Sequence, residues 1–155
     1  VEEYDGTSWS EQNDIPSSLN GMMGAGTQTA AVHFGGIATP GGSSSTGTLE
    51  YDGTNWTSGG ALPTAARYGI GVGTQTAAST TAVVANTEGW NGTSWFTQPS
   101  LGTARNAGAQ GGVGTATTGI AFGGQGSAPP YAVQNGTEEF TPESTSVNVK
   151  TITTS

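Results

Sequence analysis

Cysteine is absent from the 155 residues of this chain, and lysine and arginine together number only three, against 11 aspartates and glutamates. The absence of cysteine excludes disulfides, thiolate catalysis and thiolate metal sites, and it leaves the redox compartment open. The net charge of −8 repels polyphosphates and anionic membrane surfaces, so we predict that nucleic acid is not a partner. No apolar run is long enough to span a bilayer, which predicts no membrane insertion.

The residues that enzymes use are also scarce. His33 is the only histidine, and a general base needs an orienting partner and a pocket that stabilises the electrophile. The sequence has neither a Gly-rich phosphate loop between a strand and a helix nor a cluster of metal ligands. We therefore predict no catalytic residue, no metal site and no cofactor, and place His33 at an ordinary strand position. A carbohydrate-active enzyme stays open as an alternative, because two carboxylates can converge from distant strands.

A short cassette recurs along the chain. It reads EYDGTSW at 3–9, EYDGTNW at 50–56 and EGWNGTSW at 88–95. Its last tryptophans are 47 and then 39 residues apart, close to the period of a four-stranded repeat unit. The central Asp-Gly or Asn-Gly predicts a hairpin with a type I′ turn, in which both central residues have positive φ. We expect the tryptophans, Trp9, Trp56 and Trp95, to pack between neighbouring units.

A second repeated stretch follows a glycine-alternating segment. It reads QTAAVHFGG at 28–36 and ATTGIAFGG at 116–124, and the two copies align without a gap. Small residues in such strands allow neighbouring backbones to approach closely. Each repeat therefore predicts four antiparallel strands in an all-β domain, with an outer hairpin at 1–18 and units at 19–58, 59–98 and 99–155.

The order of an apolar residue, Gly-Gly, a variable loop, Tyr-Asp and Trp resembles the kelch repeat of β-propellers. The recurring EYDGTSW and GTQTAA units, with TEEF at 137–140 and KTITTS at 150–155, are similar to Gly/Thr-rich kelch-like virion proteins of tailed bacteriophages. The resemblance implies kelch-like propeller blades of four antiparallel strands. It also implies an extracellular or virion-surface appendage or tail-fibre protein, with other virion or fibre proteins and host surface glycans as partners.

The chain supplies about three blades, whereas propellers have about four to eight. It begins inside a hairpin, at Val1, so we expect a fragment or processed form. Either a longer chain or self-association would complete a ring, for example a dimer with six blades. Exposed edge strands also allow end-to-end growth into a filament. Our first hypothesis is a non-enzymatic structural or adhesive module, and the alternative is a filament subunit.

Unequal loops at 37–48 and 125–137 are the predicted binding face, because insertions of repeat proteins gather on one side. Tyr131 is the candidate ligand-contacting aromatic, with loop packing as the alternative. Arg67 and Arg105 hold matching places before the inner strands. We expect them to bond carbonyl groups or a cassette carboxylate such as Glu50 or Glu88. Recognition of an acidic sugar is the functional alternative for both.

Overall fold

The computed structural model describes residues 1–38, 42–81, 85–126, 132–142 and 147–152. Over these ranges the protein is all-β, with antiparallel sheets of two to four strands and no helix. There is accordingly no helix in the described ranges that is long and apolar enough to cross a membrane.

An N-terminal hairpin of two strands precedes three sheets of four strands each. Its strands are β1 (Glu2–Tyr4) and β2 (Trp9–Glu11). The first sheet has the order β4 (Met23–Thr27), β5 (Ala30–Phe34), β7 (Thr48–Tyr51) and β8 (Trp56–Ser58). A separate short pair joins β3 (Leu19–Asn20) to β6 (Ile37–Ala38).

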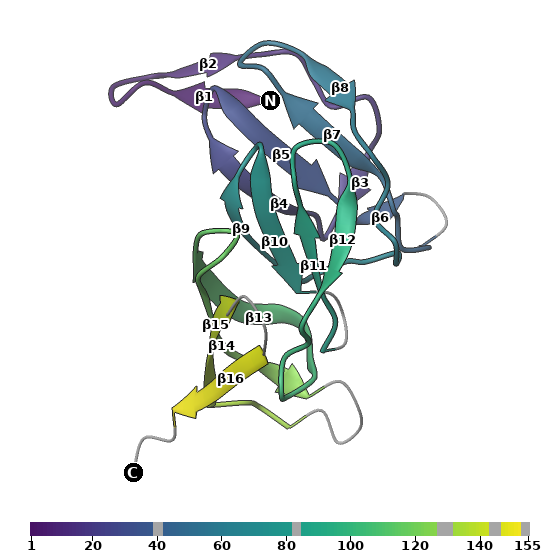
Figure 1. Cartoon of the computed structure of the whole chain (residues 1–155). Helices are drawn as coiled ribbons and strands as arrows, with labels where there is room; N and C mark the ends of the chain where they lie inside the picture. The colour runs from purple at the N-terminus through teal and green to yellow at the C-terminus, as the bar shows by residue number, and fades with distance from the viewer. Residues whose placement is uncertain (39–41, 82–84, 127–131, 143–146, 153–155) are drawn as a thin grey trace.

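The second and third sheets repeat the strand order of the first. The second runs β9 (Ile70–Thr74), β10 (Ala77–Thr81), β11 (Thr87–Trp90) and β12 (Trp95–Gln98). The third runs β13 (Arg105–Gly114), β14 (Gly119–Gly126), β15 (Thr137–Pro142) and β16 (Val147–Ile152). Figure 1 shows the hairpin and the first sheet at the top, the second sheet in the middle and the third at the bottom. Neighbours in sequence are thus neighbours in space.

The cassette forms a hairpin in each case, but the predicted type I′ turn is wrong. Tyr4 pairs with Trp9, so the loop has four residues, and of these only Gly6 has positive φ, at 99°. The Asp5 carboxylate takes over the role of a second left-handed residue, because its Oδ1 accepts the N–H groups of Thr7 and Ser8 at 2.7 and 2.8 Å. Such Asx geometry holds a tight loop without positive φ at the acid.

The same loop recurs after Tyr51 and Trp90. Asp52 Oδ1 accepts the N–H groups two and three residues ahead at 2.9 and 2.7 Å, and Asn91 Oδ1 does so at 3.0 and 2.9 Å. These backbone donors, Ser8 first for Asp5 and Asn55 first for Asp52, hold the pKa of both carboxyls below the usual value. The Asp or Asn of the cassette is therefore a structural residue.

Close packing of the glycine-alternating strands joins the sheets. Strand β4 of the first sheet lies against β9 of the second, and β9 lies against β13 of the third. A Cβ on Gly71 would collide with the Gly24 main chain, and a Cβ on Gly112 would collide with Ile70. Small residues are required because these backbones nearly touch. The larger apolar cluster lies between the first two sheets and includes Val32, Phe34, Trp90 and Trp95.

Candidate functional site

The contact between the first and second sheets shows which side chains of one sheet pack against which side chains of the next. Phe34 of β5 packs edge-on against Trp95 of β12, with ring centroids 4.9 Å apart. The Trp95 indole Nε1 donates to the Thr48 hydroxyl of the first sheet at 2.9 Å. From the second sheet, Thr80 donates its hydroxyl to the Met23 sulfur at 3.3 Å. All these side chains are buried.

The opposite face of the first sheet is less fully covered. Side chains alternate along β5, so His33 points away from the face that carries Val32 and Phe34. His33 is only 7% exposed, yet neither ring nitrogen has a hydrogen-bond partner among the described residues. Desolvation lowers the pKa of His33, so its ring is neutral at neutral pH. Trp56 meets this ring edge-on at 6.5 Å, and its buried indole nitrogen also has no partner in the described ranges.

These two side chains line an open groove between the N-terminal hairpin and the first sheet. The groove has a volume of about 590 Å³, and its apolar and aromatic wall is formed by Leu19, Met22, His33 and Trp56. Polar groups at its rim include Asp14 and Asn20. We call this feature the acceptor groove. Its position is defined by the repeat, because His33 takes the place that Thr80 holds in the second sheet.

The hairpin and the three sheets follow one another in a row, and at the end opposite the acceptor groove the third sheet exposes an apolar face. Val113, Ile120 and Phe122 are 60%, 36% and 43% exposed. The corresponding residues of the first sheet are half-buried or fully buried against the second sheet: Ala25, Val32 and Phe34. We call the three exposed residues the distal face. The two ends of the row therefore present different surfaces, the acceptor groove and the distal face. The equivalent positions between the first and second sheets are half-buried or fully buried.

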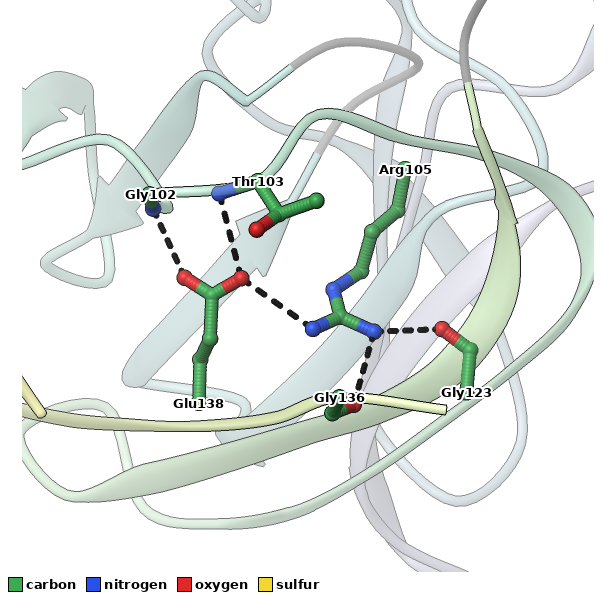
Figure 2. A network of polar contacts seen from close by, with 6 residues as sticks. All are labelled: Gly102, Thr103, Arg105, Gly123, Gly136 and Glu138. Atoms are coloured by element: carbon green, nitrogen blue, oxygen red, sulfur yellow. Dashed lines mark hydrogen bonds and ion pairs between the residues drawn. The ribbon is translucent and has the colours of Figure 1, made fainter. Parts of the chain in front are cut away.

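The predicted site residue Arg105 is fully enclosed, with 1% of its surface exposed. One guanidinium nitrogen, Nη1, donates to the carbonyl oxygens of Gly123 and Gly136, and Nη2 bonds the Glu138 carboxylate at 3.1 Å (Figure 2). Arg105 thus joins carbonyls of the third sheet to a carboxylate, which is Glu138 rather than Glu50 or Glu88. The guanidinium is therefore not accessible to a sugar.

Glu138 was not among the predicted site residues, although it organises the same network. Its Oε2 accepts the Gly102 N–H at 2.7 Å and its Oε1 accepts the Thr103 N–H at 3.1 Å, as Figure 2 shows. The carboxylate is 1% exposed, so the loop before β13 is fixed by a buried ion pair. The available signal was the repeated Thr-Glu pair at 87–88 and 137–138.

The prediction that Arg67 and Arg105 hold matching places is wrong. Leu62 and Leu101 are the true equivalents, because both are buried and make the same backbone bond. The Leu62 N–H donates to the Thr46 carbonyl, and the Leu101 N–H donates to the Ala85 carbonyl. Thr46 and Ala85 hold the same position, two residues before the Thr that starts β7 or β11. Ala66 follows Leu62 by the same number of residues as Arg105 follows Leu101, so Ala66, and not Arg67, holds the place of Arg105. Arg67 is half-buried and bonds the Gly42 carbonyl at 3.2 Å. The structure does not bring the two arginines together.

Tyr131, the predicted ligand-contacting aromatic, lies outside the described residues, as do residues 39–41 and 127–131 of the two predicted binding loops. In the described part of the chain, no group of three or more His, Asp or Glu residues lies close enough to hold a metal ion.

Glu88 takes the place of Glu138 in the second sheet, but among the described residues no arginine pairs with it. It is 3% exposed. Desolvation raises the pKa of its carboxyl, although hydrogen bonds from Thr64 act in the opposite direction. A raised pKa means that the folded state binds the proton more readily than the unfolded state does. Stability from this group is therefore highest below the ordinary carboxyl pKa of 4.5 and is lost as the pH rises through the folded value.

We expect Glu88→Gln to stabilise the protein near neutral pH, because it removes the cost of burying the charge. The gain should shrink towards zero on acidification below the ordinary carboxyl pKa. Urea unfolding at a series of pH values measures it. Glu138→Gln is the matched control: it removes the partner of Arg105 and should destabilise near neutral pH. Equal effects of the two substitutions would contradict the assignment.

No protein-family model matches the chain, and a search of curated proteins finds no matching relative. Among solved structures, the chain is similar to that of YjhT, with a TM-score of 0.72 and 15% sequence identity. The similarity covers 92% of this chain and 48% of the YjhT chain, so this chain spans about half the length of that structure. At this identity the likeness concerns the fold alone.

Proposed function

We propose that the three sheets are kelch-like β-propeller blades, and that the protein is a non-enzymatic structural or adhesive module of a phage particle or another extracellular assembly. The observation that carries the proposal is the difference between the middle of the row and its ends. Positions that are buried between the first two sheets, such as Phe34, are exposed at the distal face, such as Phe122. Apolar residues that repeat in this way are contact surfaces for a further unit.

The extracellular or virion-surface location rests on the resemblance of the cassette and the GTQTAA units to virion proteins. The acidic surface, with a net charge of −8, favours protein or glycan partners over nucleic acid. Enzymatic use of the buried acids is disfavoured, because Glu88 and Glu138 are 3% and 1% exposed and cannot reach a substrate. A glycan array combined with a hydrolysis assay separates adhesion from catalysis. Release of product from a bound glycan would overturn the non-enzymatic proposal.

The two ends are unlike, which favours a head-to-tail contact over a symmetric one. A head-to-tail contact gives a ring if it closes and a filament if it does not. Solution mass measured by light scattering across a concentration series distinguishes these results. A small oligomer of fixed size supports a closed ring, whereas polymers that lengthen with concentration support the filament alternative. A monomer at every concentration would contradict assembly through the ends.

Phe122→Glu is expected to weaken self-association by at least about tenfold, because it buries a charge in the contact made by the distal face. Phe96→Glu is the matched control. Phe96 is 47% exposed, similar to the 43% of Phe122, but it lies on the outer strand β12. The control should leave the oligomer unchanged in sedimentation or light scattering. Equal losses from both substitutions would show that general surface charge, and not the distal face, controls assembly.

A further inference from the structure

The N-terminal hairpin occupies the place of the outer half of a sheet. The Tyr51 hydroxyl donates to Glu3 Oε1 at 2.8 Å. In the next unit Glu50 and Trp90 hold the places of Glu3 and Tyr51, and both lie within 3.2 Å of a Cβ built on Gly59. The strand pairing is also shared, with Tyr4 opposite Trp9 as Tyr51 is opposite Trp56. Strands β1 and β2 are therefore the counterparts of β7 and β8.

One edge of β1 is free within the described residues. Strand β7 pairs with β8 on one side and with the inner strand β5 on the other, whereas β1 pairs with β2 alone. The N–H of Asp5 donates to the Ser8 carbonyl, and that of Gln12 donates to the Val1 carbonyl. Because hydrogen-bonded and open pairs alternate along antiparallel strands, Glu2 and Tyr4 direct their backbone N–H and C=O groups away from β2.

The acceptor groove reaches Val1, the residue directly before β1, and the repeat indicates which kind of strand fits the groove. In the second sheet Thr80, the counterpart of His33, contacts Met23 on the first strand of the preceding sheet. His33 lacks such a contact among the described residues. The counterpart of Trp56 is Trp95, which packs on Phe34 from the second strand of the preceding sheet. His33 and Trp56 therefore lie where the repeat would place an inner strand pair like β4 and β5 against them.

The turn between the inner strands supplies a further match. Gln75, in the turn between β9 and β10, donates its side-chain amide to the Tyr51 carbonyl at 2.6 Å and to the Ala31 carbonyl at 3.3 Å. This amide therefore ties one inner turn to the middle strands of the preceding sheet. Gln28 holds the same place in the first sheet and is exposed. The carbonyl of Tyr4, the counterpart of Tyr51, is one of the free groups on β1.

We propose that the acceptor groove and the free edge of β1 bind a β-hairpin of the chain's own inner type: a glycine-alternating first strand, a Gly-Thr turn and an apolar second strand. The second strand pairs with β1, and its apolar side chains contact Trp56 as Phe34 contacts Trp95. This mode is strand addition to an exposed edge, with main-chain bonds giving affinity and side-chain pockets giving specificity. The inference deepens the proposed function and rests on it, because it names the partner of one end of the row.

The test places a copy of residues 21–47 directly before Val1. In the chain these residues contain β4 and β5 and lead directly into β7, whose counterpart is β1. We expect the fusion to raise the melting temperature, to shift the tryptophan fluorescence to the blue as Trp56 becomes enclosed, and to protect the amide of Tyr4 from hydrogen exchange. A fusion whose added copy carries Asp in place of its Val32 and Phe34 equivalents should give none of these changes.

Two proline substitutions separate edge pairing from general stabilisation. Glu2→Pro removes an N–H that faces the free edge, and Glu11→Pro removes the one opposite it, on the outer edge of β2. In a trans assay with a peptide of residues 21–36, Glu2→Pro should weaken binding about tenfold and Glu11→Pro should leave it unchanged. Circular dichroism is used to check that both variants fold.

The proposal is overturned if the fusion gains no protection at Tyr4, or if the aspartate-bearing copy stabilises equally well. It is also overturned if the two proline variants lose binding equally. Failure of the proposed assembly is a separate result, because the mass series and the Phe122→Glu variant report on the distal face. The fusion and peptide measurements, in turn, report on the acceptor groove and the β1 edge and not on the distal face.

Discussion

Replacing Arg105 with methionine is expected to lower the free energy of unfolding by about 3–5 kcal/mol. Methionine fills much of the same space but removes the cation from the Glu138 carboxylate, which is 1% exposed and 3.1 Å from the guanidinium. The Gly123 and Gly136 carbonyls lose their donor at the same time. A buried charge without a partner is far more costly than the ion pair was favourable. Urea unfolding followed by tryptophan fluorescence measures the loss.

Arg67→Met is the matched control, since Arg67 is half-buried and its guanidinium bonds the Gly42 carbonyl at 3.2 Å. Its expected change is within about 0.5 kcal/mol. The double variant Arg105→Met with Glu138→Leu should recover a large part of the single-variant loss, because neither charge then remains buried. Equal losses at Arg67 and Arg105 would contradict the structural role given to the buried pair.

Much of the fold could be predicted because its signals are local and repeated. The Asp-Gly and Asn-Gly cassettes identified the hairpins, and the aligned stretches at 28–36 and 116–124 identified β5 and β14. The turn type was missed because an Asp or Asn side chain can accept the N–H groups that a left-handed residue would otherwise position. Asp5 and Asn91 both do so. Sequence alone shows the Asp-Gly pair but not which group closes the loop.

The sites were harder to predict because they depend on register and on neighbours. Arg67 and Arg105 look alike in the sequence, yet one residue of register puts Ala66, and not Arg67, in the buried place. Glu88 and Glu138 occupy equal positions with different partners. The differing environments of the cassette tryptophans are likewise invisible in a repeat, because burial is set by whether another sheet lies alongside.

Trp95→Ala is expected to cost about 3–5 kcal/mol of unfolding free energy. Trp95 is 9% exposed and lies between two sheets, where its ring meets Phe34 and its Nε1 bonds the Thr48 hydroxyl. Alanine leaves a cavity there and removes the donor of a buried hydroxyl. Chemical denaturation followed by circular dichroism gives the value without relying on the remaining tryptophans.

The same residue of the cassette at Trp9 provides the control, because it is 67% exposed and its ring contact is with Tyr4 of its own hairpin, at 5.2 Å. Trp9→Ala should cost about 1 kcal/mol or less. Trp56, half-buried at the acceptor groove, should lie between the two, and its cost should rise in the fusion that fills the groove. Equal costs at all three positions would mean that the tryptophan serves its own hairpin. The expected graded series means instead that each cassette tryptophan stabilises the chain in proportion to the sheet that covers it.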